Sequence, residues 1–198
     1  MIKNIVRFSL ISFLTMLIIV STAWAQSDWL IFRNTEFKFR FLYPPDWHIS
    51  TPRGPNVRGK VIAPNNKPNA NCVIVVRQVP ELSKSTQREI NKEISSETWS
   101  KQYWEEVMSS KFSEVFVHET KNIKIDNRPA QFATIMMSYE TIQTKIYSKS
   151  MNFITMSPGW FWHFGCGAGG ATQGEADHSF QYWTPTFLRI ISSFVFEN

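Results

Sequence analysis

The sequence predicts one α+β domain built on an antiparallel β-sheet that is packed with helices. Segments rich in β-prone residues recur along the 198-residue chain and are joined by short turns. Two stretches with helical periodicity, at about 87–111 and 175–192, interrupt these segments. Short links join antiparallel neighbours, whereas parallel strands need long crossovers. The length is compatible with a single domain.

Residues 1–25 have the parts of a secretory signal peptide. Two basic residues, Lys3 and Arg7, precede an apolar run and the small-x-small cleavage motif Ala23-Trp24-Ala25. The alternative is a membrane anchor, but the run is short for a span of about 20 residues. We therefore expect cleavage, no stable membrane span afterwards, a mature domain at residues 26–198, and a periplasmic or secreted location.

The charge argues against a nucleic-acid partner. The whole chain carries +5, and removal of the signal segment with its two basic residues leaves +3. This charge is small and scattered, unlike a nucleic-acid-binding surface. Arg53, Arg58, Lys60 and Lys67 form a local basic stretch, which is read as a solvated loop or as a surface for an anionic partner.

The stretch Phe37–Trp47 predicts a strand, a rigid corner and a buried aromatic plug. Its first three phenyl rings alternate with Lys38, Arg40 and Leu42, which places the rings on one face of a strand. Pro44 and Pro45 end the strand because they donate no backbone hydrogen bond. The other early strands are expected at Trp29–Arg33, Glu36–Leu42, Trp47–Thr51, Val57–Ala63 and Cys72–Val79, the last one central and covered on both faces.

The second half predicts helix, meander and helix. Thr86 and Glu89 form a capping box that opens the 87–111 helix. Four strands follow, with a turn at Asp126–Pro129: Glu114–Ile125, Ala130–Tyr139, Thr144–Met156 and Trp160–Cys166. The glycine-rich segment Gly165–Gly170 is expected to end the last strand as a turn. Pro185 is expected to kink the 175–192 helix or to start its second half.

Two cysteines, Cys72 and Cys166, allow one intramolecular disulfide. An oxidising compartment favours the bond. For a loop of this size, chain-entropy models predict that the disulfide stabilises the fold by about 4–5 kcal/mol. Two separate buried thiols are the competing interpretation.

The stretch Phe37–Trp47 resembles the amino-terminal signature of the PsbP-like fold, which includes periplasmic DcrB-like proteins. The turn Asp126–Ala130 and the ending Phe187–Phe194 are similar to those of the family as well. The resemblance covers most of residues 37–196 and implies an α/β/α sandwich. It implies no activity, because members of the family have unrelated roles and fold does not determine function.

The candidate catalytic and metal-binding motifs are weak. Cys166 with His163 or His178 could pair a nucleophile with a base. Residues three apart on a strand point to opposite faces, however, so Cys166 and His163 would need a bulge to meet. The four histidines have no ligand-like spacing, and the glycine-rich segment lacks the spacing of a phosphate-binding loop. The sequence therefore predicts no catalytic residue, no metal and no cofactor.

The leading functional prediction is an exported, non-enzymatic binding or accessory protein with a protein or peptide partner. Aromatic and arginine side chains often anchor partners, so Trp160, Trp162, Arg53 and Arg58 form the candidate binding surface. The alternative for each tryptophan is a buried position in the hydrophobic core, with no role in binding. Two other functions stay open: a secreted thiol enzyme that uses Cys166, and an envelope protein that binds lipid.

Overall fold

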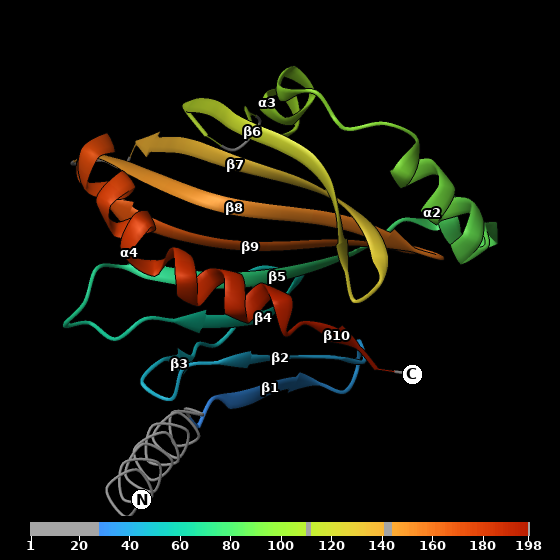
Figure 1. Cartoon of the computed structure of the whole chain (residues 1–198), viewed down its shortest axis with the longest axis horizontal. Coiled ribbons are helices and arrows are strands. Elements are labelled where there is room, and N and C mark those ends of the chain that lie inside the picture. The colour runs from blue at the N-terminus through green and yellow to red at the C-terminus, as the bar shows by residue number, and fades with distance from the viewer. Residues whose placement is uncertain (1–27, 110–111, 141–143, 198) are drawn as a thin grey trace, which may run out of the picture.

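The computed structural model describes residues 28–109, 112–140 and 144–197 (Figure 1). The predicted signal peptide lies outside these residues. The strands form two antiparallel sheets. The smaller sheet has the order β1 (Leu30–Asn34), β2 (Phe39–Tyr43), β10 (Val195–Phe196). The larger has the order β3 (His48–Ile49), β4 (Val57–Ile62), β5 (Ala70–Gln78), β9 (Trp160–Gly170), β8 (Lys145–Ser157), β7 (Arg128–Glu140), β6 (Glu114–Ile125).

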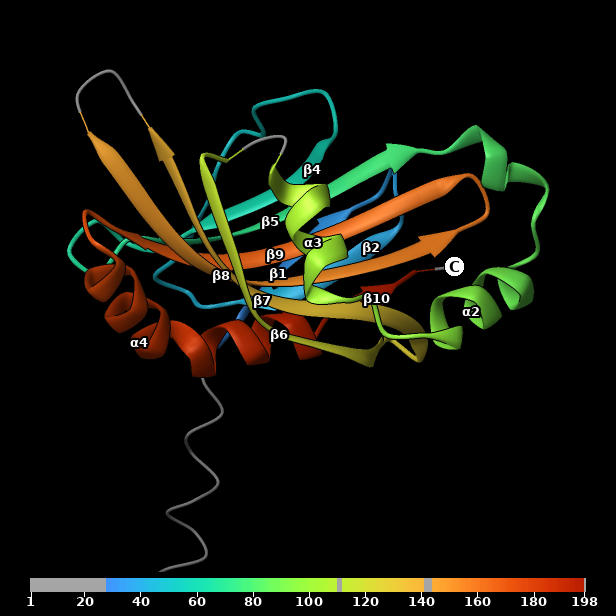
Figure 2. The same ribbon diagram turned by 90° about the horizontal axis from the view of Figure 1, so that it is seen from above.

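Helices cover both faces of the seven-stranded sheet, so the predicted α+β sandwich is confirmed. Helix α4 (Gln173–Ser192) and the small sheet share one hydrophobic cluster with Phe153 of β8. Helix α3 (Lys101–Ser109) shares a second cluster with Ile154, the next residue of the same strand. Consecutive strand residues point to opposite faces, so α3 and α4 lie on opposite faces. Figure 2 shows α3 and α4 apart from each other. Helix α2 (Gln87–Ser96) follows the short 3-10 turn η1 (Pro80–Lys84).

The opening aromatic stretch joins the two sheets. Phe39 and Phe41 are buried and contact Trp162 and Phe164 of β9. Strand β2 begins at Phe39 rather than at Glu36, because residues 35–38 form a turn in which Lys38 has a φ of 52°. Trp47 is buried against α4, as the predicted plug requires.

The disulfide prediction is confirmed. Cys72 and Cys166 face each other across β5 and β9, with their Cα atoms 4.1 Å apart and an S–S bond of 2.09 Å. Both residues are almost completely buried in the cluster beneath α4. Two central strands are therefore tied covalently across the middle of the sheet.

The predicted single helix at 87–111 is wrong, because two helices meet at an interruption. Gln131 of β7 is fully buried and its amide contacts the interruption three times. Its Nε2 donates to the carbonyls of Ile94 and Glu97, at 2.7 and 2.8 Å, and its Oε1 accepts from the amide of Trp99 at 2.9 Å. Ser100 then caps α3 by accepting from the amide of Tyr103.

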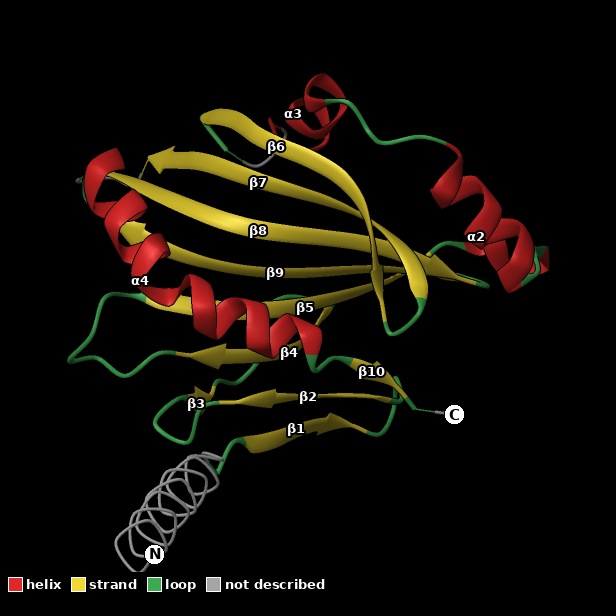
Figure 3. Ribbon diagram, in the orientation of Figure 1, coloured by secondary structure: helices red, strands yellow, loops and turns green. Residues whose placement is uncertain are grey.

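The predicted glycine-rich turn is also wrong, because residues 165–170 are the second half of β9 (Figure 3). They pair with β5 on one side and β8 on the other. A Cβ atom at Gly167 would lie 2.8 Å from the Cβ of Ser150. Glycine therefore allows a close approach of strands here, where the sequence suggested flexibility.

Strand β5 is central, as predicted, but only one of its faces is fully covered. Cys72, Ile74 and Val76 are buried beneath α4 and the small sheet. Val73 and Val75, on the opposite face, are half-buried. Helices α2 and α3 contact strands β6 to β8 instead, which leaves the β5 side of that face partly open.

Candidate functional site

The structure gathers three of the four residues of the predicted binding surface. Trp160 contacts Phe37 edge-on, with ring centres 5.3 Å apart, and the guanidinium of Arg58 lies over the Phe37 ring, 4.6 Å from its centre. Trp162 is buried, and its indole nitrogen donates to Ser157. Arg53 is exposed and makes none of these contacts. Most of this surface therefore belongs to the junction between the two sheets.

A hollow of about 400 Å³ adjoins that junction, and Trp160, Phe37 and Phe196 line it. The guanidinium of Arg128 lies 3.8 Å from the centre of the Phe196 ring. Burial lowers the pKa of Arg128 from its usual value, although Asp126 opposes this shift. Binding at these residues stays a prediction.

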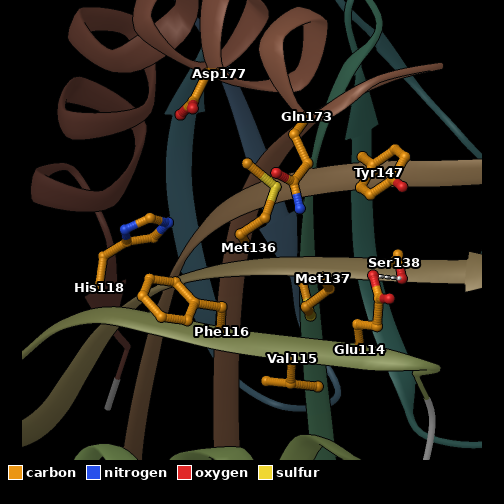
Figure 4. Close-up of a pocket in the computed structure, with 10 residues that line it drawn as sticks. All are labelled: Glu114, Val115, Phe116, His118, Met136, Met137, Ser138, Tyr147, Gln173 and Asp177. Carbon is orange, nitrogen blue, oxygen red and sulfur yellow. Dashed lines mark hydrogen bonds between the residues drawn. The ribbon is translucent and has the colours of Figure 1, made fainter.

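A second hollow, of about 470 Å³, lies between strand β6 and the start of α4 (Figure 4). We call it the β6 pocket. Met136 lies at its centre, with Phe116 and His118 of β6 on one side. Gln173 and Asp177 reach toward it from α4. Its other lining residues are Glu114, Val115, Met137, Ser138 and Tyr147.

A β-bulge in β6 lies at the edge of this pocket. The pairing of β6 with β7 shifts between Val117 and Glu119, so His118 is the extra residue. Before the bulge, Phe116 lines the β6 pocket while Val117 is buried in the α3 cluster. After it, Ile123 and Ile125 turn to the α4 side. The bulge thus changes which residues face α4, as bulges near binding sites often do.

The exposed aromatic group of the pocket is Phe116. Its side chain is 59 % exposed, although it packs edge-on against His118 with ring centres 4.8 Å apart. Met136 beneath is buried. An exposed ring above a methionine floor gives an apolar side chain two polarisable contacts.

Two ion pairs border the pocket. Glu114 pairs with Lys145 at 2.7 Å and accepts from Ser138 at 3.0 Å. These hydrogen bonds lower the pKa of Glu114, and the bond that Lys145 donates to Glu114 raises the pKa of Lys145. Lys149 pairs with Asp177 at the α4 end. Both carboxylates are therefore already neutralised by lysines.

His118 has a pKa below its usual value of 6.5. Desolvation is the largest cause, and the charge of Lys149 lowers the value further, while Asp177 partly opposes both. His118 is therefore mainly neutral near pH 7 and can donate and accept hydrogen bonds. A hollow with a few convergent polar groups and a titratable group of shifted pKa is typical of a binding site.

A third hollow, of about 540 Å³, lies on the opposite face of the sheet beneath α3. We call it the α3 groove. Its floor comes from the half-open face of β5 and from the neighbouring parts of β9 and β8. Its lining is mostly apolar and comprises Asn56, Val75, Arg77, Val79, Trp99, Tyr103, Val107, Met108, Phe112, Ile154, Met156, Phe161 and His163.

The structure gives no support to the thiol-enzyme alternative. The sulfur of Cys166 is bonded to Cys72. His163 lines the α3 groove, on the face opposite the disulfide, as its spacing from Cys166 predicts. His178 is exposed on α4. Within residues 28–109, 112–140 and 144–197, no group of three histidine, cysteine or acidic residues could hold a metal ion.

The sheets and helices form an α/β/α scaffold with a PsbP-like fold. One solved structure similar to this chain is the cyanobacterial PsbP (CyanoP) of Synechocystis, with a TM-score of 0.55 and 12 % identity. The match covers 87 % of this chain and 95 % of the CyanoP chain. Another is LpqN, involved in cell envelope biogenesis of Mycobacterium tuberculosis, with a TM-score of 0.50, 8 % identity and 88 % coverage of each chain.

These similarities confirm the PsbP-like fold and show the fold alone. No protein-family model and no curated protein matches the chain in sequence. In the part of the chain that the structure describes, no helix has the length and apolar character needed to cross a membrane.

Sequence reasoning missed the β6 pocket and the α3 groove. The signal for the pocket was the pair Phe116 and His118 on one strand, which alternation alone would place on one face. The part contributed by α4 had no such signal, because Gln173 and Asp177 reach the pocket only through packing of α4 on the sheet.

Proposed function

We propose that this protein is an exported binding or accessory protein that takes an apolar side chain of a protein or peptide partner into the β6 pocket. The observation that carries the proposal is Phe116, a phenyl ring 59 % exposed at the mouth of the hollow. Exposed aromatic anchors beside pockets contribute much of the binding energy at protein interfaces. His118 and Gln173 offer hydrogen bonds to the backbone of a bound peptide.

Export is supported by two features at separate places in the chain. Residues 1–25 have the pattern of a signal peptide, and Cys72 and Cys166 form a disulfide, as is common in oxidising compartments. Mass spectrometry of the protein recovered from the native host tests this part. We expect a chain that starts at Gln26 and carries no free thiol, and a cytosolic chain with an intact N-terminus would contradict it.

A displayed random-peptide library tests the binding itself. The mature, disulfide-bonded domain should enrich peptides that carry large apolar residues. The variant Phe116→Ser should weaken the enriched peptides about tenfold, which corresponds to about 1.4 kcal/mol. Ile49→Ser is the matched control, because Ile49 is similarly exposed, at 53 %, on the opposite edge strand of the same sheet.

Two results would overturn the proposal. One is a library that yields no enriched peptide. The other is an equal loss of binding in Phe116→Ser and Ile49→Ser, because this would assign the peptide to another surface. Both substitutions remove exposed apolar groups, so neither should change stability by more than about 0.5 kcal/mol.

A further inference from the structure

The α3 groove has a regular floor that the strand pairing defines. Val75 of β5 is paired with His163 of β9, which is paired with Ile154 of β8. In the parallel row, Arg77 is paired with Phe161, which is paired with Met156. Four of these six side chains are apolar, and the other two are His163 and Arg77, so the floor is a mostly apolar strip that spans three strands.

Helix α3 supplies the wall of the groove and has apolar residues on more than its buried side. Trp104 and Met108 pack into the cluster beneath the helix. Tyr103 and Val107, one position earlier in each turn, are 45 % and 41 % exposed and line the groove. Residues four apart lie on one face of a helix, so these two form a second apolar ridge over the floor.

The charge that the described residues give the groove is of one sign. Arg77 is the one residue with a permanent charge among the described residues that line it, and none of them is a carboxylate. The guanidinium of Arg77 lies 5.1 Å from the centre of the Phe161 ring, and the residue is exposed. Stacking on a ring holds the guanidinium at the rim while its N–H donors remain able to bind a carboxylate.

A polar row begins beside the floor. The Nε2 atom of His163 lies 3.0 Å from the Oδ1 atom of Asn152, whose amide donates to the hydroxyl of Ser150 at 2.8 Å. A Cβ atom at Gly165 would lie 3.2 Å from that Oδ1 atom. His163 and Asn152 therefore hydrogen-bond within the sheet, and Arg77 is the charged group among the described lining residues that can select a ligand.

We propose that the α3 groove binds a monomeric alkyl carboxylate, of the fatty-acid class, with its carboxylate on Arg77 and its chain between the floor and α3. Three features carry this assignment: the apolar floor and wall, Arg77 as the single cation among the described lining residues, and a volume of about 540 Å³, which lies within the usual range for small-molecule sites. The site is independent of the β6 pocket, because it lies on the opposite face of the sheet.

Titration of the mature, disulfide-bonded protein with three ten-carbon probes tests the proposal. Decanoate, decanol and decylammonium have the same chain and differ in the charge of the head. By calorimetry, decanoate should bind about five- to tenfold more tightly than decanol, and decylammonium more weakly than both. Added salt should reduce the preference, because the Arg77 contact is exposed.

Variants separate the head group from the chain. Arg77→Gln should remove the preference for decanoate and leave the affinity for decanol unchanged. Val107→Glu should weaken decanoate, because it adds a carboxylate to the wall. Arg53→Gln is the control, since it removes an equal charge from an exposed residue outside the groove. Phe116→Ser should bind decanoate as the parent does.

Three results would overturn the proposal. The first is equal binding of decanoate and decanol by the parent, and the second is an undiminished preference for decanoate in Arg77→Gln. The third is no binding of any probe at 1 mM, a concentration that corresponds to a Kd of about the weakest affinity of interest. Loss of decanoate binding in Phe116→Ser would place the ligand in the β6 pocket instead and would also refute the assignment.

Discussion

Truncation of Gln131 tests whether one buried amide separates α2 from α3. The variant Gln131→Ala removes three hydrogen bonds, to the backbone of Ile94, Glu97 and Trp99. Each such bond contributes about 0.5–1.5 kcal/mol net, so the loss should be about 3 kcal/mol. The hydrogen bond to Ile94 is buried and the other two are partly buried, so the backbone groups left without a partner favour the upper half of the range for each bond. Stabilities of whole domains are about 5–15 kcal/mol, so this loss is large.

Urea unfolding followed by tryptophan fluorescence measures this effect. With a slope of about 2 kcal/mol per molar, the midpoint of Gln131→Ala should fall by about 1–2 M. Gln181→Ala is the control, because Gln181 is exposed on α4, and its effect should stay within about 0.5 kcal/mol. Amides of α3 should also exchange faster with solvent in Gln131→Ala, while those of β9 should not change.

A loss below about 1 kcal/mol would refute the reasoning. It would mean that water satisfies the three backbone groups as well as Gln131 does. An equal loss of protection in α3 and β9 would also contradict it, because the hydrogen bonds of the Gln131 amide go to Ile94 at the end of α2 and to Glu97 and Trp99 between the helices.

Three further predictions concern the core, the disulfide and His118. Trp47→Ala should cost about 3–5 kcal/mol in urea unfolding, because Trp47 is buried and packs against α4, so its truncation leaves a cavity; a loss under about 1 kcal/mol would return it to the surface. Replacing Cys72 and Cys166 together by alanine should cost about 2–4 kcal/mol, matched by reduction of the parent, and no change would contradict the bond's role. By NMR, His118 should titrate below 6.5, and Lys149→Gln should raise its midpoint; an unchanged midpoint would exclude the charge of Lys149 as a cause.

The sign of the pH dependence follows from the lowered pKa of His118. The folded state favours the neutral ring, so its contribution to stability is fully present above pH 6.5 and is lost as the pH falls through the lower, folded-state pKa. His118 is largely exposed, so the effect on unfolding should be small. The NMR midpoint is therefore the sharper measurement.

Local patterns in the sequence were reliable where local chemistry decides the structure. Thr86 and Glu89 form both hydrogen bonds of the predicted capping box. Asp126 and Asn127 both have positive φ in the predicted turn between β6 and β7. The alternating rings at 39 and 41 enter the core as predicted. In each case the residues that carry the signal are neighbours in the chain, so no distant contact is needed to read it.

The two wrong elements failed for a common reason. The break between α2 and α3 depends on Gln131, whose amide meets Trp99 from 32 residues away. The extended form of residues 165–170 depends on β5 and β8, which flank them and provide hydrogen bonds on both sides. Helical spacing and glycine content report local preference, and tertiary contacts overrode both.

By itself, the sequence determined the α+β class and the antiparallel meander, and it limited an intramolecular disulfide to Cys72 with Cys166, while the structure decided that the bond forms. Only the tertiary structure decided where the surface is hollow. Strand β6, with its bulge at His118, and the start of α4 border the β6 pocket, and the displacement of α3 from β5 leaves the groove at Arg77. Hollows form where packed elements do not cover one another, and that depends on the docking of whole helices rather than on any one segment.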